Sequence, residues 1–400
     1  GDNNTAVGNE AMEANTTGGA NTAFGADALG ANTTGDYNTA VGQNALDANT
    51  TANNNTAVGQ AALGANTTGT ANTAIGAAAS DATTTGSYNT SVGAEALGAH
   101  TTGAENTAVG YNSTSALTTG SNNTAMGAHS LVAVTDQAGN AAFGRYTLAA
   151  CTGNYNSAFG YLGLNAATTA GNNATLGHMA GVAVTTGGNN TLVGTEAGDG
   201  VTTGTLNTLV GYNAGSETNI LTTGGDNVLV GAHTNTSAAG SVKQIVIGYN
   251  VSGVGNNQAT LGHNANTASL SLDGSDTSWA AASSDKRLKE NIETSTAGLA
   301  LINDLRPVTY NWKKAKDVPT DMPQYVEGSE EPVLGYEYGK SQHGFIAQEA
   351  KVALDKHRKD IADGFNFWIE KDDGTQTVAD GNLIPILTKA VQELSAQVDE

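Results

Sequence analysis

The sequence is poor in proline, cysteine, aromatic residues and charge. Of its 400 residues, 5 are proline and 1 is cysteine, while 5% are aromatic and 13% are charged. This scarcity argues against a disordered chain, because disordered segments are usually rich in charge and proline. The single cysteine, Cys151, excludes an intrachain disulfide framework and a multi-cysteine metal site. We expect it to be a small core residue.

The net charge of −21 disfavours two classes of partner. Residues 1–282 carry 16 acidic and 2 basic side chains, and residues 283–400 carry 21 and 14. Such an acidic surface repels phosphate backbones and anionic lipids, so we expect no nucleic-acid partner. No apolar run approaches the roughly 20 residues that cross a bilayer, and the N-terminal GDNN does not resemble a signal peptide. We therefore expect no membrane insertion. The sequence begins within a repeat, so we expect it to be a fragment of a longer chain.

A glycine recurs at a nearly constant interval over the first two thirds of the sequence. It ends an NTAVG-like motif at 16 positions from Gly8 to Gly262, and twelve of the fifteen intervals are 17 residues long. The other intervals are 16, 20 and 14 residues. Self-similarity at a fixed short period is typical of solenoids, so we expect stacked coils over residues 1–272.

Each coil is expected to contain two short strands. In YNTAVGQNALDANTTAN, a Thr-Ala-Val alternation precedes the glycine, an Ala-Leu stretch follows it, and a turn closes the unit. This pattern predicts strands joined by tight turns, with glycine and asparagine where positive φ is needed. We interpret the apolar residue before each glycine as part of a continuous buried ladder: Val7, Phe24, Val41, Val58, Ile75, Val92, Val109, Met126, Phe143, Phe159, Leu176, Val193, Val210, Val230, Ile247 and Leu261.

A single chain of this kind has little core. Each coil offers about two large apolar side chains and an alanine face, which is too little to offset chain entropy. We therefore expect neighbouring chains to bury a second face, and a threefold axis lets a rod do so along its whole length. Sixteen coils at about 4.8 Å each predict a rod of roughly 75–80 Å. The expected partner is the chain itself, in a homotrimer.

The repeats resemble the heads of trimeric autotransporter adhesins over roughly residues 1–270. That family builds a left-handed parallel β-roll from coils of about 14 residues with the same apolar-Gly motif. Most coils here are three residues longer, and only the interval from Gly248 to Gly262 returns to 14. The resemblance implies a parallel β-roll.

Two patterns within the repeat have competing interpretations. Asn-Thr-Thr is a formal glycosylation sequon, at Asn15 for example, but its recurrence at a turn favours turn chemistry and asparagine stacking. His178 and His263 each follow the repeat glycine. Three copies around an axis could bind a metal ion, whereas exposed polar side chains are the simpler interpretation. We predict no cofactor and no resident metal.

The repeat ends near residue 272, and a different kind of sequence begins after a link at residues 273–283. Residues 284–400 have the charge and helical periodicity of a small α+β domain. Helices are predicted within 297–305 and 346–360. At the C terminus an apolar seam steps by 3, 4, 3 and 4 residues, which predicts a bundling helix. Its members are Ile384, Leu387, Val391, Leu394 and Val398.

Four blocks of this last segment resemble the intramolecular chaperone of endosialidase-type phage tail fibres and tailspikes. They are SSDKRLKENI, LRPVTYNWKK, HGFIAQEA and NLIPILTKAVQELSAQVDE, in that order. The resemblance implies a domain at 284–400 that trimerises the fibre, aids its folding and then cuts itself off. The family's Ser-Lys dyad falls on Ser284 and Lys289, and its cleavage point lies between Ser283 and Ser284.

The chemistry of that dyad can be examined on the residues themselves. A serine attacking the preceding carbonyl forms an ester that water hydrolyses, and the nucleophile needs a neighbouring base. Lys289 can serve only when neutral, which requires a fall in pKa of about 3 units, or roughly 4 kcal/mol, from burial and nearby cations. Lys286 and Arg287 would contribute. Because Ser284 and Lys289 are five residues apart, a bend or a neighbouring chain must bring them together.

Several neighbouring residues could support this chemistry. Asp285 and Glu290 could tune the dyad or cap a helix, and Asn291 and Arg287 flank it. His343 could orient a reacting group, although a structural hydrogen bond is the simpler interpretation.

The sequence thus predicts a mainly β, homotrimeric phage tail-fibre protein that ends in a self-cleaving chaperone. The only expected reaction is one autoproteolytic cut per chain. The expected partners are the chain itself, other virion tail proteins and a host receptor that is a glycan or a surface protein. We expect assembly in the host cytoplasm and residence in the virion. The alternatives are a bacterial trimeric adhesin head and the non-catalytic part of a glycan-degrading tailspike. The repeats show no paired carboxylates of the kind that glycosidases use.

Overall fold

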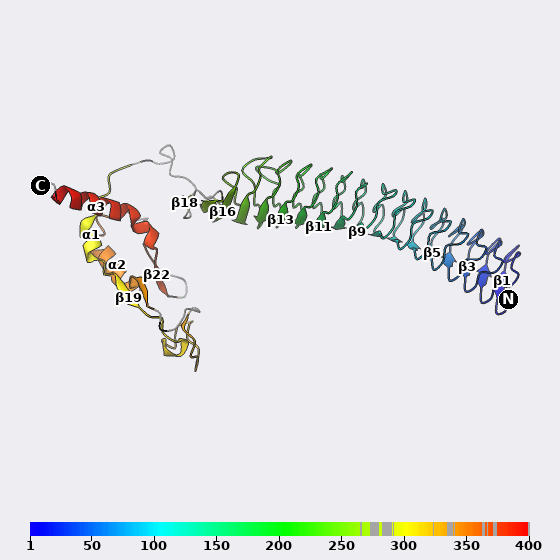
Figure 1. Ribbon diagram of the computed structural model, residues 1–400, viewed down its shortest axis with the longest axis horizontal. Helices are drawn as coiled ribbons and strands as arrows, with labels where there is room; N and C mark the ends of the chain where they lie inside the picture. The colour runs from blue at the N-terminus through cyan, green and yellow to red at the C-terminus, as the bar shows by residue number, and fades with distance from the viewer. Residues whose placement is uncertain are drawn as a thin grey trace. The chain divides into compact units, whose positions relative to one another are not determined.

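The computed structural model describes residues 1–264, 266–272, 280–281, 290, 292–322, 324–333, 339, 341–361, 365, 367–370 and 374–398. The chain divides into two compact units, residues 1–284 and residues 285–400 (Figure 1). The Ser283–Ser284 junction falls outside the described residues.

The first unit is a parallel β-solenoid with one short strand per coil (Figure 1). Consecutive strands from β1 to β16 pair in parallel. The solenoid predicted from the 17-residue period is confirmed. The strands are β1 (Thr5–Val7), β2 (Thr22–Phe24), β3 (Thr39–Val41), β4 (Thr56–Val58), β5 (Thr73–Ile75), β6 (Thr90–Val92), β7 (Thr107–Val109), β8 (Thr124–Met126), β9 (Ala141–Phe143), β10 (Ser157–Phe159), β11 (Ala174–Leu176), β12 (Thr191–Val193), β13 (Thr208–Val210), β14 (Val228–Val230), β15 (Ile245–Tyr249) and β16 (Gln258–His263).

The sheet reverses direction after its last parallel strand. β17 (Asn266–Ser271) pairs antiparallel with β16, and β18 (Ala280–Ala281) pairs antiparallel with β17. This hairpin covers the open edge that the last coil would otherwise present to a further strand.

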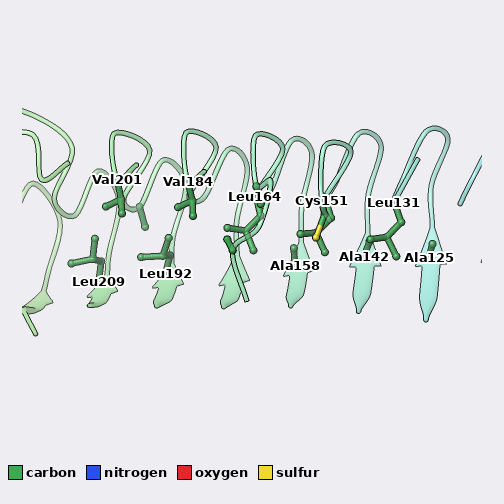
Figure 2. Close-up of a cluster of buried hydrophobic side chains, with 14 of the residues drawn as sticks. Ala125, Leu131, Ala142, Cys151, Ala158, Leu164, Val184, Leu192, Val201 and Leu209 are labelled. Carbon is green, nitrogen blue, oxygen red and sulfur yellow. The ribbon is translucent and has the colours of Figure 1, made fainter. Parts of the chain in front are cut away.

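The residue before each repeat glycine points outward, so the predicted buried ladder is wrong. Phe24 is 58% exposed and Leu176 is 55% exposed, whereas the middle residues of the same strands, Ala23 and Thr175, are buried. Side chains alternate along a strand, so when the middle residue of a three-residue strand faces inward, the first and third both face outward. The core instead combines this middle residue with buried residues of the returning segment (Figure 2).

The second stretch of each coil is a turn, although the sequence predicted a strand there. Two of its residues have left-handed backbone conformations, as Asn44 (φ 58°) and Leu46 (φ 51°) show in the third coil. A strand cannot contain such residues. Left-handed leucine costs roughly 1–2 kcal/mol, but Leu46 is completely buried, and burial of leucine repays about that amount. The expectation that glycine and asparagine would fill these positions is therefore only partly correct.

The repeat glycine is required by its contact with the next coil. At Gly42 φ is 133°, and a Cβ atom added there would lie 2.5 Å from the carbonyl oxygen of Gly59. Both the backbone conformation and the close approach exclude any other residue. The most regular feature of the sequence thus sets the spacing between coils.

Buried asparagines form ladders along the solenoid, as the stacking interpretation predicted. Asn49 Nδ2 donates to Asn32 Oδ1 at 2.9 Å, and Asn66 Nδ2 donates to Asn49 Oδ1 at 3.0 Å. A second ladder lies just before the strands, where the backbone N–H of Asn55 donates to Asn38 Oδ1 at 3.0 Å. Asn32, Asn49 and Asn66 are completely buried, so the sequons there are not open to glycosylation.

A polar layer interrupts the apolar core of the solenoid. One buried cluster runs from Met12 to Ala79 and the next begins at Ala96. Between them, Ser80 Oγ donates to Ser91 Oγ at 2.9 Å, and Thr83 Oγ1 lies 3.1 Å from His100 Nδ1. All four side chains are buried, so each polar group depends on a neighbour in the layer for its hydrogen bonds.

The second unit is a small α+β domain that ends in a helix, as predicted. Its elements are α1 (Leu299–Asp304), β19 (Val308–Tyr310), the 3₁₀ turn η2 (Ala315–Asp317), β20 (Gln342–Gly344), α2 (Ala347–Lys356), β21 (Trp368–Glu370), β22 (Gln376–Val378), the 3₁₀ turn η4 (Asp380–Leu383) and α3 (Ile384–Val398). β19 pairs antiparallel with β20, and β21 with β22. The core of the unit contains Ala297, Leu301, Leu305, Ala350, Ala353, Phe367, Leu383 and Ile386.

Candidate functional site

Most residues assigned to self-cleavage lie outside the described part of the chain. They are Ser283, Ser284, Asp285, Arg287, Lys289 and Asn291. The dyad of Ser284 and Lys289 stays a prediction. Glu290 is described and exposed, and His343 is described and exposed.

His343 lies in the middle of β20, at the mouth of an open depression. In the β19–β20 pair it stands opposite Thr309. The depression has a volume of about 520 Å³ and is lined by Pro307, Val308, Thr309, His343, Gly344 and Phe345. The role assigned to His343 in the reaction stays a prediction.

Strand pairing and ion pairs join the separate sequence blocks of this unit. β19 belongs to the LRPVTYNWKK block and β20 to the HGFIAQEA block. Arg306 Nε donates to Glu349 Oε2 at 2.9 Å, and this guanidinium lowers the pKa of the Glu349 carboxyl. Both side chains are exposed, so the pair links the two sequence blocks but adds little to stability.

The C-terminal helix is tied to α1 through its carboxylates. Glu393 Oε2 accepts a hydrogen bond of 2.8 Å from the backbone N–H of Leu299, the first residue of α1. This bond, assisted by Lys389, lowers the pKa of Glu393. Glu393 and Leu299 are 94 residues apart, so no local pattern in the sequence indicated this contact.

A cluster of charged side chains fixes the ends of α1 and α2. Lys356 Nζ and His357 Nε2 lie 2.7 and 2.5 Å from Asp304 Oδ2. Lys356 and then His357 lower the pKa of the Asp304 carboxyl. A helix was predicted within 346–360, but the contacts of His357 with α1 were not predicted.

One face of α3 carries an uncovered apolar seam at the positions predicted from the sequence. Ile384, Leu387, Val391, Leu394 and Val398 are 43–78% exposed. Ile386 and Ala390, on the opposite side, are buried, and Ile386 belongs to the core of the unit. The seam borders a shallow groove lined by Ile384, Leu387, Thr388, Val391 and Gln392.

Two further classes of site are absent from the described ranges. In them, no group of three or more His, Cys, Asp or Glu residues is placed to hold a metal ion. No helix described there is long and apolar enough to cross a membrane.

Comparison with known proteins identifies one part of the chain. Residues 284–359 match the family model for the chaperone of endosialidase, peptidase S74. The match begins at Ser284 and includes β19, β20 and α2. No curated protein and no solved structure matched the chain. A β-solenoid followed by this domain fits a tail fibre with a C-terminal chaperone.

Proposed function

We propose that this chain, with its endosialidase-chaperone segment at 284–359, is a structural and adhesive subunit of a phage tail fibre. The solenoid serves as shaft or head and presents a receptor-contacting surface. The C-terminal unit drives trimerisation and folding, then releases itself by cutting between Ser283 and Ser284. The observation that carries the proposal is the family match directly after a regular solenoid. The protein is expected in the virion, after assembly in the host cytoplasm.

Exposed apolar residues in the solenoid support a homotrimer. The outward ladder before the repeat glycines occurs in all sixteen coils, and Val7, Ile75 and Ile247 in it are 41–49% exposed. Burying the remaining half of such a side chain stabilises by about 1 kcal/mol. Nine of the sixteen ladder residues are 38–58% exposed. Summed over these nine, the gain is on the order of 9 kcal/mol per chain, before the entropy of association is subtracted. A rod can cover such a stripe along its full length only with parallel copies of itself.

The seam on α3 supports the same assembly at the other end of the sequence. Its residues follow heptad spacing, and they remain exposed after the helix has packed against α1 and η4. Two heptads are marginal as an isolated coiled coil, so the helices are proposed to bundle while their own units hold them in place.

The proposed cut needs no external cofactor. Ser284 Oγ attacks the carbonyl carbon of Ser283 while neutral Lys289 Nζ takes the hydroxyl proton. The C–N bond breaks, the leaving nitrogen takes that proton, and an ester joins Ser283 to Ser284 Oγ. Water then hydrolyses the ester, leaving a Ser283 carboxylate and a free amine on Ser284. Lys286, Arg287 and their copies around a threefold axis would lower the pKa of Lys289, so cutting would follow assembly.

Intact mass and native size of the purified chain test this function. Wild type is expected to form a trimer and to yield a fragment beginning at Ser284, whereas Ser284→Ala and Lys289→Ala stay whole. Ser283→Ala is the matched control, because it keeps the attacked carbonyl and should still be cut. A monomeric chain with an intact junction would overturn the proposal. Full cleavage in a monomeric variant would refute the dependence of cutting on assembly.

A further inference from the structure

One corner of the solenoid carries aromatic and imidazole rings only in its C-terminal part. The two positions after the repeat glycine contain no ring in the first six coils, from Asn9 to Glu95. In nine of the next ten coils one of these two positions is Tyr or His. We call this set the ring stripe: Tyr111, His129, Tyr146, Tyr161, His178, Tyr212, His233, Tyr249 and His263.

Rings of the stripe contact one another from coil to coil. The longest run joins Tyr212 to His233, His233 to Tyr249 and Tyr249 to His263, with centroid distances of 5.1, 5.7 and 5.4 Å. The tyrosines remain open to water, with Tyr212 47% and Tyr249 48% exposed. The contacts hold the rings in place, while about half of each tyrosine surface stays available to a partner.

Two shorter groups lie nearer the middle of the solenoid, in the coils of β7 to β11 (Figure 1). Tyr111, His129 and Tyr146 have centroid separations of 5.3 and 5.2 Å, and Tyr161 and His178 are 5.7 Å apart. His178 and His263, singled out in the sequence beside the repeat glycine, thus each stack on a tyrosine.

Side-chain amides lie next to these rings. Asn112 Nδ2 is 3.2 Å from His129 Nδ1, and Asn264 Nδ2 is 3.0 Å from His263 Nδ1. Asn250 Nδ2 donates to Asn264 Oδ1 at 2.9 Å. Each amide can also donate to and accept from a ligand hydroxyl. The stripe therefore combines apolar ring surface with paired donors and acceptors.

The distribution of the rings argues against a role in joining copies of the chain. A contact between parallel rods needs the same kind of residue in every coil, and the outward apolar ladder has it in all sixteen. The ring stripe begins only at Tyr111 and uses rings with polar tips. A partner other than this chain accounts for a surface confined to one part of the rod.

We propose that the ring stripe binds a neutral glycan chain. The C–H faces of sugars pack on aromatic rings, and their hydroxyls pair with amides such as Asn250 and Asn264. Successive coils are about 4.8 Å apart, close to the length of one sugar unit, so neighbouring rings can follow successive units. The 16 acidic and 2 basic residues of 1–282 repel anionic chains. This inference rests on the proposed attachment function and assigns a surface to it.

Binding of the full-length trimer to an array of neutral and acidic bacterial surface glycans tests the inference. The test variant is Tyr146→Ala/Tyr161→Ala/Tyr249→Ala, called the ring variant, which removes one ring from each of the three groups. The control is Tyr88→Ala, because Tyr88 is 64% exposed in a coil that lacks the ring stripe. We expect wild type and the control to bind at least one neutral glycan, and the ring variant to bind it at least tenfold more weakly.

Three results would overturn the inference. They are no binding to any neutral glycan, preference for acidic glycans, and equal loss of binding in the control. A fourth is loss of the trimer in the ring variant, which would assign the rings to the contact between copies. Cleavage and native size are measured on the same preparations. A correctly cut trimer that binds no glycan therefore refutes the ring stripe alone and leaves the proposed function standing.

Discussion

His100 is expected to make the solenoid sensitive to acid at its polar layer. The imidazole is completely buried, and its Nδ1 lies 3.1 Å from Thr83 Oγ1. Burial lowers its pKa from 6.5 to about 4, and a hydrogen bond to Gly103 opposes this only partly. The folded solenoid therefore holds His100 neutral at a pH where the unfolded chain would protonate it.

The size of the effect follows from the two pKa values. The folded pKa lies below the unfolded one, so His100 contributes its full stability above pH 6.5 and loses it as the pH falls towards 4. At pH 5 the loss is about 2 kcal/mol, and it approaches roughly 3 kcal/mol below pH 4. Burial raises the pKa of Asp47 and Asp81, so these carboxyls favour the folded state as the pH falls, opposite to His100. Their contribution is removed by comparing wild type with a variant that lacks only His100.

His100→Asn supplies that variant. Asn occupies the equivalent position in earlier coils, where Asn49 and Asn66 form the buried ladder. Hydrogen exchange of backbone amides near residues 80–106 would be followed at pH 7.5 and pH 5 in both proteins. Between pH 7.5 and pH 5, the protection factors of wild type should fall roughly thirtyfold more than those of the variant. This ratio corresponds to the loss of about 2 kcal/mol. The same pH dependence in both proteins would refute the reasoning.

Three further changes test other parts of the structure. Gly42→Ala should prevent the native stacking of two coils and lower the melting temperature strongly, because its Cβ would meet the Gly59 carbonyl oxygen at 2.5 Å. Gly64→Ala should be tolerated, because the nearest atom to its Cβ is the Ala61 carbonyl oxygen at 3.2 Å. Asn123→Leu should lower the free energy of unfolding by at least about 2 kcal/mol, because it leaves the N–H of Asn140 and the carbonyl of Gln137 without their bonds to Asn123. An unchanged denaturation midpoint would contradict a stabilising role for the asparagine ladder. Val391→Asp should weaken trimers in sedimentation experiments while helix content stays constant, because Val391 is 65% exposed in a single chain; unaltered sedimentation would remove the α3 seam from the interface.

The period of the solenoid was predictable because a stacked coil repeats its chemistry. Gly42 and its equivalents recur wherever the backbone of one coil meets the next, so their spacing gives the length of a coil. The direction of side chains was harder to predict. Thr-Ala-Val fits a strand with either face buried, and the larger Val suggested the core. The structure buries alanine because the narrow coil must also contain Leu46 and Asn49.

The C-terminal unit shows the same division between local and distant information. Heptad spacing predicted the exposed seam on α3, since spacing along one helix fixes which residues share a face. The contact from Glu393 to Leu299 joins residues 94 positions apart, and periodicity carries no signal for such a pair. The predicted site at Ser284 and Lys289 came from resemblance to a family, and the family match at 284–359 supports that resemblance without testing the dyad.

The asparagine ladders make the length of the solenoid modular. Asn38 bonds to the equivalent asparagines of the coils on both sides. The backbone N–H of Asn38 donates to Asn21 Oδ1, and the backbone N–H of Asn55 donates to Asn38 Oδ1. Removing one whole coil would bring identical partners together, whereas removing a few residues would break the ladder at one point. Fibres of different reach can therefore evolve by gain or loss of complete repeats, without redesign of either end.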